Sequence, residues 1–128
     1  MIKNEELISE WLRRAKSNLK RAREGKSSDE IVYEDLCFDA QQAVEKSLKA
    51  LLVKLNKPFP RTHSIEMLLK LIEETGTEIP EDINQARILT GYAVDSRYPG
   101  IYERVSEEEY NEAVTFAGRV FDWVDSII

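Results

Sequence analysis

The residues best suited to chemistry in this sequence are gathered in one stretch between Tyr92 and Tyr102. It contains three tyrosines together with Asp95 and Arg97, and a Pro-Gly pair interrupts it. A fixed arginine can bind a phosphate through paired hydrogen bonds, and tyrosine rings can stack on a base. The same residues could instead form a loop that an Asp95–Arg97 pair and buried tyrosine rings hold to the body of the protein. Both interpretations place Tyr98 beside Arg97.

A second polar group, Gln41, Gln42, Glu45 and Lys46, lies in a long segment whose apolar residues recur at steps of three and four. That spacing is typical of one face of a helix, so these four side chains would lie together beside the apolar face. They form either an ordinary solvated flank with paired charges or the polar wall of a binding site.

His63 is the only histidine, and it lies directly before Ser64 at the start of a predicted helix. A histidine in this position usually bonds a backbone group or a neighbouring side chain, but imidazole also transfers protons readily near neutral pH. One histidine and one cysteine cannot form a structural zinc site, so we expect no metal and no cofactor. The cysteine, Cys37, falls on an apolar helix face, where we expect a small buried hydrophobe.

Basic side chains form a stripe on the first predicted helix, at Arg13, Lys16, Lys20 and Arg23. Residues 1–27 contain eight Lys or Arg against four Glu, a net charge of +4, whereas residues 28–128 contain ten against twenty, a net charge of −10. The stripe is either a solvated face or a phosphate-binding strip. The overall net charge of −6 argues against a general nucleic-acid coat protein.

Five helices are expected to position these residues. The longest is the segment 28–56, which contains no Pro or Gly and begins after the capping residue Ser28. At roughly 27 residues it would be about 40 Å long, so the other helices must pack around it. The remaining start and stop signals are Asn4 and Gly25, Thr62 or Ser64 before Ile65–Glu74, Pro80 before a fourth helix, and a Ser106/Glu109 capping box before Glu107–Ile127.

These signals predict one all-α domain over residues 1–128, an up-and-down four-helix bundle with an additional short helix. The last helix has an apolar arc wide enough either for a broad core or for a second subunit, and we expect a homodimer. The N-terminal residues show no apolar signal core, and no apolar run approaches the length of ~18 residues that a membrane span needs. The sequence therefore predicts a cytoplasmic protein without membrane attachment.

Three motifs in order along the chain resemble the HEPN family. They are Gln41-Gln42-Ala43-x-Glu45-Lys46-x-Leu48-Lys49-Ala50, then His63-Ser64, then Arg97-Tyr98-Pro99. The resemblance extends over nearly the whole chain and implies a helical up-and-down bundle, often a homodimer. It also implies a partner, because many prokaryotic members form toxin–antitoxin pairs with a minimal nucleotidyltransferase.

Active members of that kind resemble metal-independent ribonucleases with Arg, four to six residues, then His. Here Arg97 matches the arginine, but Tyr102 stands where the histidine would be, and a phenol is a poor general base at pH 7. The resemblance therefore implies a catalytically silent module that binds a nucleotide or RNA. Its expected site residues are Arg97 for phosphate, Asp95 to orient Arg97, Tyr98 and Tyr102 for stacking, and Gln42, Glu45 and Lys46 as the polar wall.

Two alternatives stay open. The first is a metal-independent endoribonuclease in which His63 reaches Arg97, across a dimer interface if necessary. The second is a purely structural subunit that binds no nucleotide. A further hypothesis concerns Tyr102, whose phenol oxygen a nucleotidyltransferase partner could modify with a nucleotide.

Overall fold

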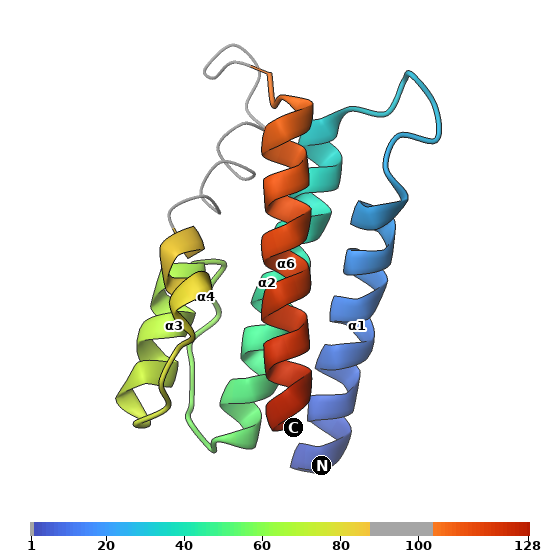
Figure 1. Cartoon of the computed structure of the whole chain (residues 1–128). Helices are drawn as coiled ribbons and strands as arrows, with labels where there is room; N and C mark the ends of the chain where they lie inside the picture. The colour runs from blue at the N-terminus through green and yellow to red at the C-terminus, as the bar shows by residue number, and fades with distance from the viewer. Residues whose placement is uncertain (1, 88–103) are drawn as a thin grey trace.

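The computed structural model describes residues 2–87 and 104–128, which form five helices with no strand among them. These are α1 (Asn4–Glu24), α2 (Tyr33–Lys54), α3 (Ile65–Glu74), α4 (Glu81–Ala86) and α6 (Glu107–Ile127). The long helices α1, α2 and α6 run side by side, and α3 and α4 pack on the side away from α1 (Figure 1). The predicted all-α bundle with an additional short helix is confirmed.

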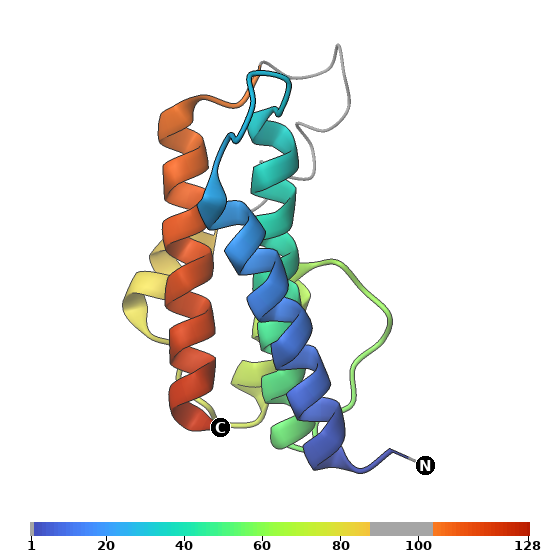
Figure 2. The ribbon, with the colours of Figure 1, turned by 90° about the vertical axis from the view of Figure 1, so that its right-hand side faces the viewer.

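The central element is α2, which contacts α1, α3 and α6. Most of its residues are buried, including Ala43, Leu48 and Leu51 with no exposed surface. Small side chains let the neighbouring helices approach closely, and the Ser47 hydroxyl bonds the Ala43 carbonyl at 2.7 Å, which satisfies a polar atom in the core. The segment that connects α2 to α3 runs beside α2, on the side opposite α6 (Figure 2).

The wide apolar arc of α6 is used mainly by the core of this one chain. Phe116, Val120 and Val124 are buried with residues of α1, α2, α3 and α4, and Phe121 and Trp123 pack against the same cluster. At the end of the helix the apolar side chains of Ile127 and Ile128 stay 39% and 38% exposed. The arc is therefore wide because α6 contacts several helices at once.

A second apolar cluster closes the opposite end of the bundle. Tyr33 and Tyr110 stack with ring centroids 4.9 Å apart, and the Lys26 ammonium lies 4.3 Å from the Tyr33 ring centre. The Tyr110 hydroxyl also donates a hydrogen bond to the Ala22 carbonyl, which ties α6 to the end of α1. Cys37 is buried in this cluster, as predicted.

Two predicted helix caps are wrong. The long helix begins at Tyr33 after Val32, and the Ser28 hydroxyl instead accepts a hydrogen bond from the Glu30 amide in a turn before the helix. A serine side chain competes with the helix in this way because it bonds nearby backbone groups. Asn4 lies within α1, which starts after Lys3, and its side chain donates to Asn56 Oδ1 at 3.1 Å.

Other boundaries agree with the sequence signals. Ser64 caps α3 by accepting from the Met67 amide, and Ser106 and Glu109 form the predicted capping box of α6. Gly25 and Gly76 adopt φ values of +72° and +87° just after α1 and α3, which only glycine tolerates readily. Pro80 precedes α4, as predicted, and residues 88–103 lie outside the described residues.

Candidate polar site on the central helix

Four polar residues of α2 share one quadrant of the helix: Gln42, Glu45, Lys46 and Lys49. At 100° per residue they fall within an arc of about 100°, and we call this group the α2 polar face. The contacts of its members place it between α1 on one flank and His63, which precedes α3, on the other. Three of the four were predicted site residues.

On one flank the face holds a carboxylate–imidazole pair. His63 Nδ1 lies 3.0 Å from Glu45 Oε2, and the exposed fractions of the two side chains are 81% and 1%. Burial raises the pKa of Glu45, and His63, Lys49 and Lys46 counteract this increase. A buried carboxylate thus fixes an imidazole that is itself open to solvent, which is an arrangement suited to proton transfer or to binding an anion.

The second carboxylate oxygen of Glu45 has no hydrogen-bond partner among the described residues. Glu45 Oε1 and Gln41 Oε1 are both shielded from solvent, and neither accepts a hydrogen bond from any of the described residues. Gln41 lies one helical turn before Glu45, so two buried acceptors occur close together on α2. A buried acceptor without a donor costs free energy, which agrees with the increase that burial causes in the pKa of Glu45.

On the other flank the face is joined to α1 through Lys46. Its ammonium donates to Asn18 Oδ1 at 2.7 Å, and Asn18 Nδ2 donates to Asp39 Oδ1 at 3.0 Å. Arg21 continues the chain of contacts at 3.5 Å from Asp39. Burial lowers the pKa of Lys46, and the nearby Arg14 lowers it further, while Glu45 and Asp39 counteract both.

Lys49 completes the face. It is only 9% exposed, and its ammonium lies 5.4 Å from the centre of the Trp11 ring on α1. A desolvated cation over an indole ring is held by the ring quadrupole as well as by packing. Lys49 was not a predicted site residue, although its position four residues after Glu45 was a signal that could have identified it.

The basic stripe predicted on α1 is not one uniform cationic strip. Arg13 makes two hydrogen bonds to Glu10, at 2.9 and 2.7 Å. Arg23 extends over α6, where its Nη2 lies 2.6 Å from the point that a Cβ on Gly118 would occupy. Lys16 and Lys20 are exposed and make no ion pair with the residues that the structure describes. The α1 cation that the structure places in contact with α2 is Arg21, which is not part of the predicted stripe.

The predicted site residues Asp95, Arg97, Tyr98 and Tyr102 lie outside the described residues. Of the predicted polar wall, Glu45 and Lys46 lie on opposite flanks of the face, and Gln42 is half-buried between them. His63 meets Glu45 directly, so its contact with a neighbouring side chain, one of the expected structural roles, is confirmed.

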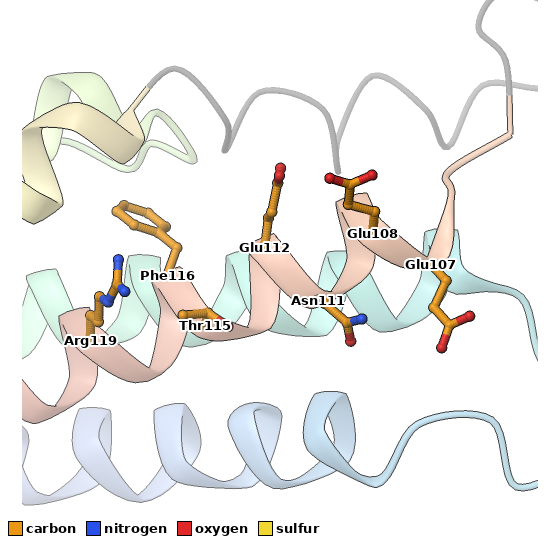
Figure 3. Close-up of a pocket in the computed structure, with 7 residues that line it drawn as sticks. All are labelled: Glu107, Glu108, Asn111, Glu112, Thr115, Phe116 and Arg119. Atoms are coloured by element: carbon orange, nitrogen blue, oxygen red, sulfur yellow. The ribbon is translucent and has the colours of Figure 1, made fainter.

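A separate pocket lies along the outer side of α6 and has a volume of about 610 Å³. Figure 3 shows Glu108, Glu112 and Phe116 projecting from the same side of the helix. Its other lining residues are Glu107, Asn111, Thr115 and Arg119, and Arg119 also lies 4.0 Å from Asp82. Three glutamates against one arginine give the described lining of this pocket a negative charge, which disfavours a phosphate.

The described residues, 2–87 and 104–128, lack two features that would bear on function. They contain no group of three or more His, Cys, Asp or Glu side chains placed to hold a metal ion. None of their helices is both long enough and apolar enough to cross a bilayer.

Together the contacts define a small helical bundle whose central helix carries a cationic polar face and an anchored imidazole. A family model described as the HEPN domain matches residues 8–127. The chain therefore belongs to the HEPN family, as the sequence motifs predicted. The crystal structure of an archaeal HEPN homologue is similar to it, with 30% identity, coverage of 93% of this chain and 95% of that one, and a TM-score of 0.66. A comparison with curated proteins gave no match.

Proposed function

We propose that this HEPN protein is a homodimeric, catalytically silent module that binds a nucleotide or RNA and pairs with a minimal nucleotidyltransferase in a toxin–antitoxin-like system. The proposal rests mainly on the α2 polar face. Lys46 and Lys49 concentrate positive charge there, and His63 offers an exposed imidazole beside them. Cationic and imidazole groups on one face suit a ligand that carries phosphate.

In this proposal the segment around Arg97 supplies the remaining contacts. Arg97 would bind a phosphate, Asp95 would orient Arg97, and the rings of Tyr98 and Tyr102 would stack on bases. Gln42, Glu45 and Lys46 would form the polar wall opposite them. Binding of AMP and of a short single-stranded RNA, compared between the wild type and Arg97→Ala, tests this arrangement. We expect the variant to bind both at least tenfold more weakly.

The partnership is a separate part of the proposal, and membership of the HEPN family supports it. We expect a minimal nucleotidyltransferase encoded next to this protein to co-purify with it after co-expression. Light scattering on the isolated protein should give the mass of a dimer. A monomer that retains no nucleotidyltransferase after washing would contradict both statements.

Co-expression also tests whether Tyr102 accepts a nucleotide. Intact-mass measurement should show an increase of one or more nucleoside monophosphates, and Tyr102→Phe should remove it. Tyr98→Phe is the matched control, since it removes a neighbouring hydroxyl from the same motif. An unchanged mass in the wild type would refute modification at this residue while leaving the binding proposal intact.

One observation favours a second candidate, a metal-independent endoribonuclease that uses Arg97 with His63. The bond from a buried Glu45 carboxylate to the exposed His63 ring is the arrangement that orients a general base. Incubation of a mixed RNA substrate with purified protein in EDTA distinguishes the two functions. We expect no cleavage by the wild type. Cleavage that both Arg97→Ala and His63→Ala abolish would establish the ribonuclease instead.

A further inference from the structure

The seam between α1 and α2 contains a second cationic group outside the motif around Arg97. Arg14 and Asn18 are one helical turn apart on the same face of α1, and Asn18 holds the Lys46 ammonium at 2.7 Å. Arg14 is also close enough to Lys46 to affect its titration. One guanidinium and one ammonium from different helices therefore face the same edge of the bundle.

The acidic groups nearby do not fully neutralise the positive charge of the seam. Glu10 is shared by two guanidinium groups, since its Oε1 accepts from Arg14 Nε at 2.9 Å and also from Arg13. Asp39 bonds Asn18 and lies 3.5 Å from Arg21. Glu45 is occupied with His63 on the other flank of the α2 polar face. Glu10 and Asp39 thus each contact a further guanidinium, that of Arg13 and that of Arg21, and the seam keeps an excess of positive charge.

Both cations also retain unused donors. An ammonium has three N–H groups and a guanidinium has five. Lys46 donates to Asn18 alone, and Arg14 donates to Glu10 through Nε alone, among the residues that the structure describes. Arg14 is 56% exposed, so the Nη groups are open to a ligand. The guanidinium of Arg14 can donate two parallel hydrogen bonds to phosphate oxygens, and the ammonium of Lys46 adds a compact positive charge beside them.

We propose that Arg14 and Lys46 form a phosphate-binding site at the seam between α1 and α2. The ligand class rests on the proposed function, because the phosphate belongs either to a free nucleotide or to the backbone of RNA. Asn18 is the positioning residue of this site, since its amide fixes the ammonium of Lys46. In RNA binding the seam contacts the backbone and adds affinity without reading sequence.

Fluorescence anisotropy with a labelled single-stranded oligoribonucleotide between 50 and 200 mM KCl tests the site. We expect Arg14→Gln and Lys46→Gln each to weaken binding about five- to tenfold, and each to reduce the slope of log Kd against log salt by about 0.7. Lys20→Gln is the matched control, because it removes the same charge from an exposed position of α1 that is in no ion pair with the described residues. It should change Kd less than twofold.

Lys46→Arg keeps the charge and should bind within threefold of the wild type. If circular dichroism shows that Lys46→Gln does not fold, Arg14→Gln still tests the site, because the Arg14 side chain is exposed and its replacement should leave the fold intact. Competition with AMP and with inorganic phosphate separates the two phosphate sources. Displacement of the RNA by AMP at micromolar concentration indicates a nucleotide site, whereas resistance to both competitors indicates a backbone site.

An unchanged salt slope in Arg14→Gln and Lys46→Gln, or an equal loss in Lys20→Gln, would overturn the seam site. The proposed function would survive that result if Arg97→Ala still abolished binding. A wild type that binds neither RNA nor AMP would refute both the seam site and the nucleotide-binding function, so the two failures can be told apart.

Discussion

Glu45 is the residue whose environment departs most from what its side chain prefers in water. The carboxylate is 1% exposed, bonds His63 through one oxygen and has no partner for the other among the described residues. Burial raises its pKa, so the folded state favours the protonated form. A buried carboxylate with one hydrogen bond is a poor source of stability, which argues for a functional role of Glu45.

Substitution of Glu45 tests how its buried carboxylate affects the stability of the fold. Glu45→Gln keeps an oxygen for His63 and removes the carboxylate. When folding raises the pKa of an acid, the free energy of unfolding falls as the pH rises above the ordinary pKa of that acid. The amide of glutamine does not titrate, so the variant lacks this loss. We expect Glu45→Gln to match the wild type near pH 4 and to exceed its free energy of unfolding by up to about 1 kcal/mol at pH 8. Urea unfolding at both pH values measures this difference.

Glu45→Ala is the contrasting variant, since it leaves His63 without its acceptor and creates a cavity. It should lose about 2 kcal/mol or more. If Glu45→Gln proves as unstable as Glu45→Ala at pH 8, then the charge on Glu45 stabilises the fold through His63, and the interpretation above is wrong.

Cys37 gives a second prediction at this scale. Burial, with contributions from Glu34 and Glu109, raises its pKa to about 12, so almost no thiolate is present at pH 8. We expect folded protein to resist iodoacetamide at that pH for hours, and the same protein in urea to react within minutes. Mass spectrometry of timed samples measures the labelled fraction. Rapid, complete labelling without urea would mean that the cluster around Tyr33 and Tyr110 opens readily.

Local sequence signals account for part of the site. The spacing of Glu45 and Lys46 predicted a shared helix face, and a position before a capping serine predicted that His63 would bond a neighbour. The sequence could not show that Glu45 is this neighbour, because the contact depends on the path of the segment between α2 and α3. It also could not identify Asn18 and Arg14, because their pairing with α2 depends on the register between two helices.

At the scale of elements, Ser106 and Ser28, two of the serines predicted as caps, behave differently. Ser106 accepts from the Glu109 amide while the Glu109 side chain accepts from Ser106, so both donors at the start of α6 are satisfied. Ser28 has the same side chain but precedes Glu30 in a turn, five residues before α2 begins. A serine followed by acidic residues is thus not a sufficient sign of a helix start.

This difference predicts opposite outcomes for one substitution. Ser106→Ala should lower the free energy of unfolding by about 1 kcal/mol, because it exposes the donors of α6. Ser28→Ala should lower it by less than about 0.5 kcal/mol, because no helix depends on its hydroxyl. Urea unfolding of the two variants in parallel measures the difference between these losses. Equal losses would place the start of α2 near Ser28 after all.

At the scale of the molecule, the bundle is organised by the burial of α2. The long run without Pro or Gly predicted that this helix would be central, and its apolar periodicity predicted that one face would be buried. The wide arc of α6 left open whether the excess apolar surface met a second subunit. Phe116 and Trp123 account for much of this apolar surface, because they pack within this chain in a cluster that includes residues of α3 and α4. The sequence did not specify where α3 and α4 would lie.

Leu48 tests the central position of α2. It has no exposed surface and lies in the main core cluster. Leu48→Ala should therefore cost about 2–5 kcal/mol, which is enough to unfold a marginal domain at 37 °C. Met67→Ala on α3, where the side chain is 42% exposed, should cost less than about 1 kcal/mol. Thermal denaturation compares them, and similar shifts would mean that the core is not concentrated around α2.

The contact between Lys49 and Trp11 has a practical consequence. The chain contains two tryptophans, and the second, Trp123, lies on α6 and packs against the core. In a Trp123→Phe background, Trp11 becomes the only indole, with a cation 5.4 Å from its ring. Its emission then reports the electric field beside the α2 polar face without any added dye. An anion that draws Lys49 from the ring would change the wavelength of that emission, so the protein carries its own optical sensor of occupancy.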